Sequence, residues 1–124
     1  MFSLSSTNRY YLFNQPCDMR KGFQGLSGLV TAKMGKDPIS GDVFIFINRR
    51  ATHIKLLHWE SGGFVIYYKR LEKGTFSLPK VLESGNVSWS QLVLMIEGIK
   101  AEKLRHLSRY NPAASLDFTD KNTK

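Results

Sequence analysis

The sequence lacks the features that mark secreted, membrane-spanning or disulfide-bonded proteins. It has one cysteine, Cys17, in 124 residues, which excludes an internal disulfide and a cysteine-rich zinc site. Its longest apolar runs are far shorter than the roughly 20 residues that a membrane helix needs. The mixed, polar opening Met1–Leu12 does not resemble a secretion signal. These absences predict a cytoplasmic protein that does not enter a membrane.

Catalytic and cofactor motifs are also missing. The chain has no P-loop, dinucleotide fingerprint, HExxH motif or nucleophile elbow, so no cofactor is expected. His53 and His58 are five residues apart in a predicted strand and therefore point to opposite faces. Cys17 has no activating neighbour, which favours a small buried hydrophobe. Since the acidic residues show no paired spacing, we expect a protein that is not an enzyme, and a nuclease is the least favoured class.

Acidic residues are scarce relative to basic ones. The chain has 10 Asp and Glu against 18 Lys and Arg, a net charge of +8. An excess of positive charge on a small domain attracts polyanions such as nucleic acids. It also increases solubility, so composition alone leaves both interpretations open.

The segment Asp42–Phe76 has the pattern of an antiparallel meander. Three apolar runs, Val43–Asn48, His53–Glu60 and Phe64–Arg70, alternate with short polar or glycine-containing breaks. The break Ser61-Gly62-Gly63 is typical of a tight turn with positive φ. Both faces of these strands are partly apolar, which predicts a sheet covered on one side and partly covered on the other, with Ile66 buried.

Shorter signals flank the meander. We expect a strand at Arg9–Phe13, a helix over residues 18–34 capped by Asp18, and a short strand at Thr75–Leu78. A capping box, Ser88-x-x-Gln91, predicts a second helix over residues 88–100. The glycines of the first helix weaken it and favour close packing against the sheet; they are Gly22, Gly25 and Gly28. Gly35 is a plausible end for that helix.

These signals predict one α+β domain over residues 1–109, followed by a flexible tail over residues 110–124. The domain combines an antiparallel sheet of four or five strands with two main helices. A small β-barrel with flanking helices is the alternative.

Basic and aromatic residues interleave within the predicted sheet. Arginine and lysine can hold phosphates while aromatic rings stack on bases, so this pattern favours nucleic-acid binding through a basic sheet surface. The candidate contact residues are Arg20, Lys21, Arg49, Arg50, Lys55, Trp59, Tyr68, Lys69 and Arg70.

An ordered series of short motifs resembles the small TnpB-type accessory protein of bacterial insertion elements of the sixty-six family, which is distinct from the RNA-guided nuclease of the same name. The matching segments are Asp18-Met19-Arg20-Lys21-Gly22-Phe23-x-Gly25-Leu26, Asp37-Pro38-x-Ser40-Gly41, Phe44-x-Phe46, Asn48-Arg49-Arg50, Lys55-Leu56-Leu57-x-Trp59-x-x-x-Gly63, Tyr68-Lys69-Arg70-Leu71-Glu72-x-Gly74-x-Phe76 and Ile96-Glu97-Gly98. Each segment is weak alone, whereas their common order is specific. His58 and Tyr67-Tyr68 depart from the family pattern, and residues 101–124 lie outside the resemblance.

The resemblance implies a role in DNA transposition beside a separate, larger transposase that carries the catalytic residues. It carries over no catalytic residue to this chain. A DNA-binding accessory protein accounts for both the resemblance and the charge. An adaptor that docks the transposase without touching DNA accounts for the resemblance equally well.

Overall fold

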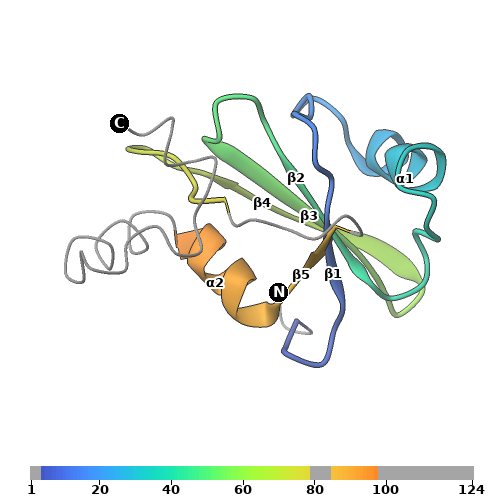
Figure 1. Ribbon diagram of the computed structural model, residues 1–124. Helices are drawn as coiled ribbons and strands as arrows, with labels where there is room; N and C mark the ends of the chain where they lie inside the picture. Colours follow the sequence, from blue (N-terminus) through green and yellow to red (C-terminus); the bar gives the residue numbers. More distant parts are fainter. Residues whose placement is uncertain (1–3, 79–84, 98–124) are drawn as a thin grey trace.

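The computed structural model describes residues 4–78 and 85–97 as a five-stranded sheet with one helix on each face (Figure 1). The elements in chain order are β1 (Tyr10–Leu12), α1 (Phe23–Ala32), β2 (Val43–Ile47), β3 (His53–Glu60), β4 (Gly63–Arg70), β5 (Asn86–Val87) and α2 (Trp89–Glu97). The strand order β4-β3-β2-β1-β5 forms an open sheet, which confirms the α+β prediction over the barrel. The predicted helical residues 98–100 and the predicted tail, 110–124, lie outside the described residues.

The predicted meander is confirmed almost residue for residue. β2 pairs antiparallel with β3, and β3 pairs antiparallel with β4 along its whole length. The turn between β3 and β4 has Ser61 at φ 51° and Gly62 at φ 82°. Two successive positive φ angles are typical of the tight hairpin turn that matches the twist of the flanking strands.

The predicted antiparallel pairing is confirmed for all described strand pairs except β1 with β2, which is parallel; the long connection through α1 makes this one parallel pair possible. A separate prediction, of a short strand after β4, is wrong. No strand forms at Thr75–Leu78. Phe76 and Leu78 are buried there, but the Phe76 N–H donates to the carbonyl oxygen of Ala51 at 2.7 Å instead of joining a ladder. The fifth strand is β5, which pairs antiparallel with β1.

Helix α1 begins at Phe23, so the predicted cap at Asp18 is wrong. Gly22 occupies the cap position without a side-chain hydrogen bond. The Asp18 carboxylate accepts instead from the backbone N–H of Arg20 at 2.9 Å and from the Arg20 guanidinium. The N–H groups of Arg20 are closer to the Asp18 carboxylate in the chain than the first N–H groups of α1, and they bind it instead.

The glycines of this segment are not sites of close packing against the sheet, contrary to the prediction. A methyl group added at Gly22 or Gly28 would meet no atom within 4 Å, and at Gly25 it would meet the Lys21 side chain. Nothing in the structure explains this row of glycines. Gly35, by contrast, has φ 65° just beyond the helix, as the end of α1 requires.

Side chains from both faces of the sheet are buried, so coverage is more complete than predicted. Phe44 and Phe46 of β2 pack toward Leu26 and Val30 of α1. The alternate residues of β2 pack with Leu92 and Met95 of α2; they are Val43, Ile45 and Ile47. All five residues of β2 are buried as a result. Ile66 is only half-buried, because β4 is the outermost strand.

A buried lysine fastens the segment before α1 to its face of the sheet. Lys55 of β3 is 8% exposed. Its Nζ donates to the carbonyl oxygens of Met19 at 2.9 Å and Lys21 at 2.8 Å. The same ammonium lies 4.6 Å from the centre of the Tyr68 ring. These contacts replace the water that a buried charge loses.

A second lysine, Lys69, connects the sheet to α2 on the opposite face. Lys69 of β4 donates from Nζ to the carbonyl oxygen of Ile96 at 2.8 Å, in the last described turn of α2. A cation near the C-terminal end of a helix also interacts favourably with the helix dipole. The other end of α2 has the predicted capping box, since Ser88 and Gln91 exchange hydrogen bonds. In the described part of the chain, neither helix is long and apolar enough to span a membrane.

The two residues of one cross-strand pair on the α1 face give a test of the core. Leu57 is fully buried, whereas its partner Ile66 is half-buried on the edge strand. We expect Leu57→Ala to lower the free energy of unfolding by about 2–5 kcal/mol, and Ile66→Ala by clearly less. Urea denaturation of the two variants measures both changes, and an equal loss would contradict the burial described above.

Removing the Lys55 ammonium should destabilise the fold. Lys55→Met keeps most of the side-chain volume but leaves two carbonyl oxygens without their donor, so we expect a loss of about 1–3 kcal/mol. Lys33→Met is the control, because Lys33 is exposed and should change stability by no more than about 0.5 kcal/mol. Equal unfolding midpoints for the two variants would show that the Lys55 contacts contribute nothing.

Candidate nucleic-acid interface

The structure does not bring the predicted contact residues together on one sheet surface. Lys55 lies on the α1 face and Lys69 on the α2 face, and each ammonium binds backbone carbonyl oxygens. Neither is offered to an external phosphate. Of the predicted contact residues, the basic ones that remain exposed are Arg20, Arg49, Arg50 and Arg70.

The two aromatic candidates are also separated. Trp59 lies near the β3–β4 turn and packs edge-on against Phe64, with ring centres 5.0 Å apart. Tyr68 lies toward the other end of β4, beside Lys55 and with its ring 6.0 Å from that of His53. Tyr68 is 52% exposed, so its outer ring face is open to a partner.

The turn between β2 and β3 is held in a fixed shape by Asn48. The Asn48 side-chain oxygen accepts from the backbone N–H groups of Thr52 at 2.9 Å and His53 at 3.0 Å. Its backbone carbonyl accepts from the N–H of Ala51 at 3.0 Å. Ala51 has φ 58°, a left-handed conformation that is costly for a non-glycine residue. Arg49 and Arg50 therefore lie in a turn whose backbone shape is held by Asn48.

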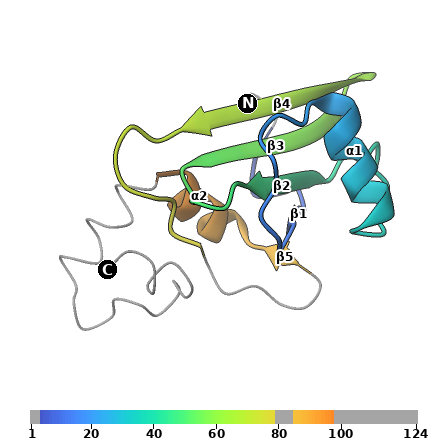
Figure 2. The same cartoon turned by 90° about the horizontal axis from the view of Figure 1, so that it is seen from above.

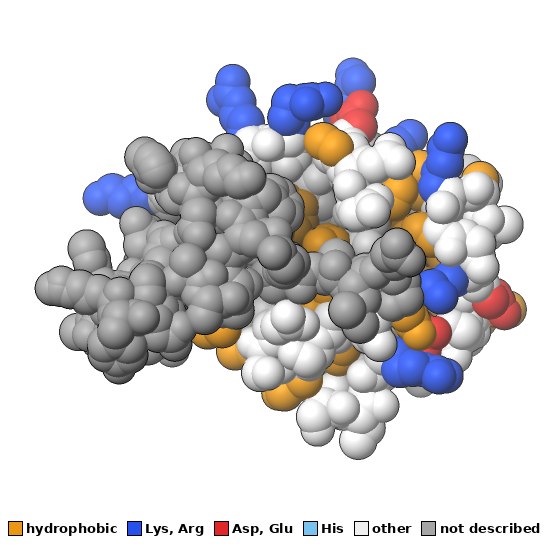
Figure 3. All heavy atoms as spheres, viewed as in Figure 1, with side chains coloured by type: hydrophobic (Ala, Val, Ile, Leu, Met, Phe, Trp, Pro, Cys, Tyr) orange, Lys and Arg blue, Asp and Glu red, His pale blue; other side chains and the backbone are white. Residues whose placement is uncertain are grey.

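Both turn arginines are exposed, and in the described part of the chain neither forms an ion pair. The segment between β1 and α1 lies beside them, since the Cys17 N–H donates to the Ile47 carbonyl oxygen at 2.9 Å. In the view of Figure 3, Lys and Arg side chains gather along the upper edge of the molecule. We call the surface formed by Arg20, Lys21, Arg49 and Arg50 the basic end.

The other exposed arginines are paired with carboxylates. Arg20 contacts Asp18 at 2.8 Å, and Arg70 contacts Glu72 at 2.9 Å. The side-chain hydrogen bonds from Arg20, followed by its backbone N–H, lower the pKa of Asp18 to about 2. Asp18 is therefore ionised at neutral pH and offsets part of the Arg20 charge. Arg49 and Arg50 carry the least compensated charge of the candidate set.

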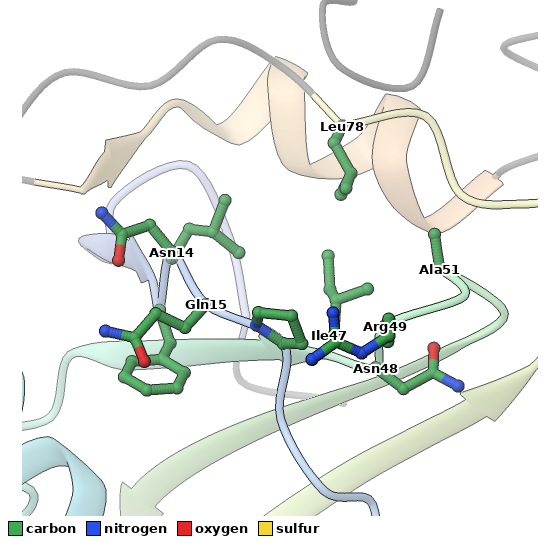
Figure 4. A pocket seen from close by; sticks show the side chains of 10 residues that line it. Asn14, Gln15, Ile47, Asn48, Arg49, Ala51 and Leu78 are labelled. Atoms are coloured by element: carbon green, nitrogen blue, oxygen red, sulfur yellow. The ribbon is translucent and has the colours of Figure 1, made fainter. Parts of the chain in front are cut away.

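A small hollow lies between the Asn48–Ala51 turn and the segment after β1, with a volume of about 140 Å³. Its lining residues are Leu12, Phe13, Asn14, Gln15, Pro16, Ile47, Asn48, Arg49, Ala51 and Leu78. Arg49 lies back across the hollow next to Ile47, and the amides of Asn14 and Gln15 stand on the opposite side (Figure 4). Sequence reasoning missed Asn14 and Gln15, because polar residues before a proline indicated only a break between elements.

The chemistry available at this end is recognition of anions. An arginine guanidinium presents several N–H donors in a planar fork that matches the oxygens of a phosphate. Within residues 4–78 and 85–97, no three His, Cys, Asp or Glu side chains come together to hold a metal ion. Burial raises the pKa of the Cys17 thiol, which disfavours the reactive thiolate.

Comparison with known proteins identifies relatives along most of the chain. Residues 8–106 match the family described as IS66 Orf2-like protein (TnpB of IS66). The uncharacterized protein y4jC of Sinorhizobium fredii is 32% identical over 92 residues, which cover 73% of this chain and 79% of that protein. The uncharacterized protein y4hO of the same organism is 30% identical over 93 residues, which cover 73% and 80%.

No solved structure gives a significant match. The family match covers the segments that carried the sequence resemblance, and the family is not a known catalytic one. The chain thus belongs to the IS66 Orf2-like family, and this membership suggests an accessory role in transposition.

Proposed function

We propose that the protein is a non-catalytic accessory factor of transposition that binds DNA through its basic end, beside the transposase of the same element. The observation that carries this proposal is the pair Arg49 and Arg50. Both are exposed, adjacent and without an ion-pair partner in the part of the chain that the structure describes. The family membership supplies the transposition context.

The fixed turn makes these arginines suited to a phosphate backbone. Asn48 holds the turn before any partner arrives, so binding does not have to order the loop. Contacts from guanidinium groups to phosphates position a protein on DNA without reading its sequence. We therefore propose backbone recognition at the basic end, with Tyr68 as a neighbouring aromatic surface and without Lys55 or Lys69.

An adaptor role is the second candidate, and a groove beside α2 favours it. The groove has a volume of about 370 Å³ and is lined by Leu4, Tyr67, Trp89, Leu92, Val93, Ile96 and Glu97. Trp89 and Val93 are 37% and 36% exposed, so apolar surface is open there. An apolar segment of the transposase is the partner that this groove would take. The test is the binding of purified transposase to two variants of this protein. If Trp89→Ser loses the binding and Arg49→Ala keeps it, the adaptor role is favoured.

Loss of both turn arginines should weaken DNA binding without unfolding the protein. We expect Arg49→Ala with Arg50→Ala to reduce affinity for element-end DNA. The slope of log affinity against log salt should become shallower by up to about 2, because about two phosphate contacts are lost. Fluorescence anisotropy titrations over a salt series measure both effects, and the thermal midpoint should stay close to that of the wild type.

The matched control removes the same charge elsewhere. Lys33→Ala with Lys36→Ala lowers the net charge equally at the far end of α1, where Lys33 is exposed and Lys36 lies 4.2 Å from the Tyr11 ring centre. This control should keep most of the affinity and most of the salt slope. Equal losses in the two double variants would show that net charge alone, and not the basic end, attracts DNA.

Freeing Arg20 from its carboxylate should strengthen DNA binding. Asp18→Asn removes a negative charge with almost no change in volume, so we expect tighter binding and a salt slope steeper by up to about 1. Because the pKa of Asp18 is held at about 2, the wild-type carboxylate stays charged throughout pH 5–8. Its pairing with Arg20 is lost only as the pH falls toward that value.

Asp37→Asn is the comparison for this charge change. Asp37 is exposed and accepts a backbone hydrogen bond from Ile39, away from the basic end. If Asp37→Asn raised affinity as much as Asp18→Asn does, Arg20 would have no special place in the interface.

A further inference from the structure

The outer edge of β4 is open in the described part of the chain. β4 is the terminal strand of the sheet, spans eight residues and pairs only with β3. Figure 2 shows it along the margin of the molecule, with β3 on its inner side. A strand in this position presents a row of unpaired backbone groups.

The hydrogen-bonding phase of the sheet identifies which groups point outward. Just past β4, the Leu71 N–H donates to the Thr52 carbonyl oxygen at 2.9 Å, in the same register as the β3–β4 ladder. Hydrogen-bonded pairs alternate along an antiparallel ladder. The odd-numbered residues of β4 therefore bond to β3. The backbone N–H and C=O groups of the even-numbered residues point away from the sheet; these residues are Phe64, Ile66, Tyr68 and Arg70.

Within the described residues, the segment Gly63–Tyr68 of this edge lacks the usual protection against strand pairing. Proteins blunt exposed edges with proline, bulges or charged side chains. β4 contains no proline, and its register with β3 is continuous from Gly63 to Arg70. Residues Phe64–Tyr68 are all apolar or aromatic, and the Lys69 ammonium is turned to the Ile96 carbonyl oxygen. The edge is thus suited to receive another strand.

We propose that a second copy of this chain pairs with it, β4 against β4 in antiparallel orientation, with Ile66 on the two-fold axis. In this register Phe64 faces Tyr68 of the other copy, and the outward groups of Phe64, Ile66 and Tyr68 form roughly six hydrogen bonds. The two sheets become one continuous ten-stranded sheet. The contact is isologous, as a two-fold dimer requires.

The side chains favour this register over the neighbouring one. With Ile66 on the axis, aromatic Phe64 meets aromatic Tyr68, and Val65 meets Tyr67, both favourable cross-strand pairs. Lys69 then lies opposite Gly63, which has no side chain. A shift that puts Tyr67 on the axis keeps the hydrogen-bonding phase but sets Arg70 opposite Phe64. Ile66 is the centre of the apolar segment Phe64–Tyr68, so only the register about Ile66 pairs this whole segment with itself.

The pairing also determines where the basic ends lie. The Asn48–Ala51 turn directly precedes β3 and so lies beside the end of β4 that carries Arg70. An antiparallel partner presents its own turn at the opposite end of the joined strands. The dimer would therefore carry two basic ends that face apart, although the pairing does not depend on what those ends bind.

Cysteine cross-linking tests the register directly. In Ile66→Cys the two introduced thiols should meet across the axis, since Cα atoms of a hydrogen-bonded pair lie about 5.5 Å apart, a distance that a disulfide spans. Native Cys17 is buried and gives little background. Tyr68→Cys is the control, because Tyr68 is more exposed than Ile66 but would lie about 13 Å from its own copy. Mild oxidation should give a disulfide dimer for Ile66→Cys alone. Equal or greater cross-linking of Tyr68→Cys would overturn the register.

Sedimentation over a concentration series tests the dimer itself. Wild type should shift to twice the mass of one chain as concentration rises. Ile66→Ala and Ile66→Pro both truncate the side chain, but only proline removes the outward N–H, and it spares the ladder with β3. We expect Ile66→Ala to dimerise. The dimer dissociation constant of Ile66→Pro should be at least tenfold higher, and the two variants should have similar circular dichroism spectra. A wild type that stays monomeric, or an Ile66→Pro variant that dimerises normally, would refute the proposal. If Ile66→Pro fails to fold, the cross-linking pair decides.

Discussion

The ammonium group of Lys55 is the contact on which the α1 side of the molecule depends. It is buried beneath the segment that leads into α1 and donates to two backbone carbonyl oxygens of that segment while lying over the Tyr68 ring. A buried cation without these partners would be costly. The interaction therefore fixes where residues 18–22 cross the sheet, and with them the positions of Arg20 and Lys21.

Lys69 has the corresponding place on the other face, where it binds the last turn of α2. Because the two helices cover opposite faces, the middle of the sheet is closed to any partner, and β2 is buried from both sides. In the described part of the chain, the surfaces left for recognition include the loops at the ends of the strands, the groove beside α2 and the outer edge of β4. The basic end and the β4 edge are two such surfaces, and they suit different partners: an anion in one case and a polypeptide strand in the other.

Some features could be predicted because neighbouring residues decide them. The alternation in β2, β3 and β4, the glycine turn at Ser61–Gly63 and the capping box at Ser88 each depend on residues close together in the chain. Predictions failed where two local outcomes competed. The Asp18 carboxylate could cap a helix or bind Arg20, and the nearer donors won. Phe76 and Leu78 had the spacing of a strand, but burial in an irregular segment satisfies the same pattern.

The sequence by itself determined the family through the order of its motifs, the α+β class through its periodicities, and the excess of positive charge. Only the tertiary structure decided which of those charges face outward. Alternation along a strand shows which residues share a face, but it does not show what covers that face. Lys55, Lys69 and Arg49 look alike in the sequence. They differ because the segment before α1 supplies carbonyl oxygens to Lys55 and the last described turn of α2 supplies one to Lys69. Arg49 lies in an exposed turn at the end of the sheet, where no described carboxylate pairs with it.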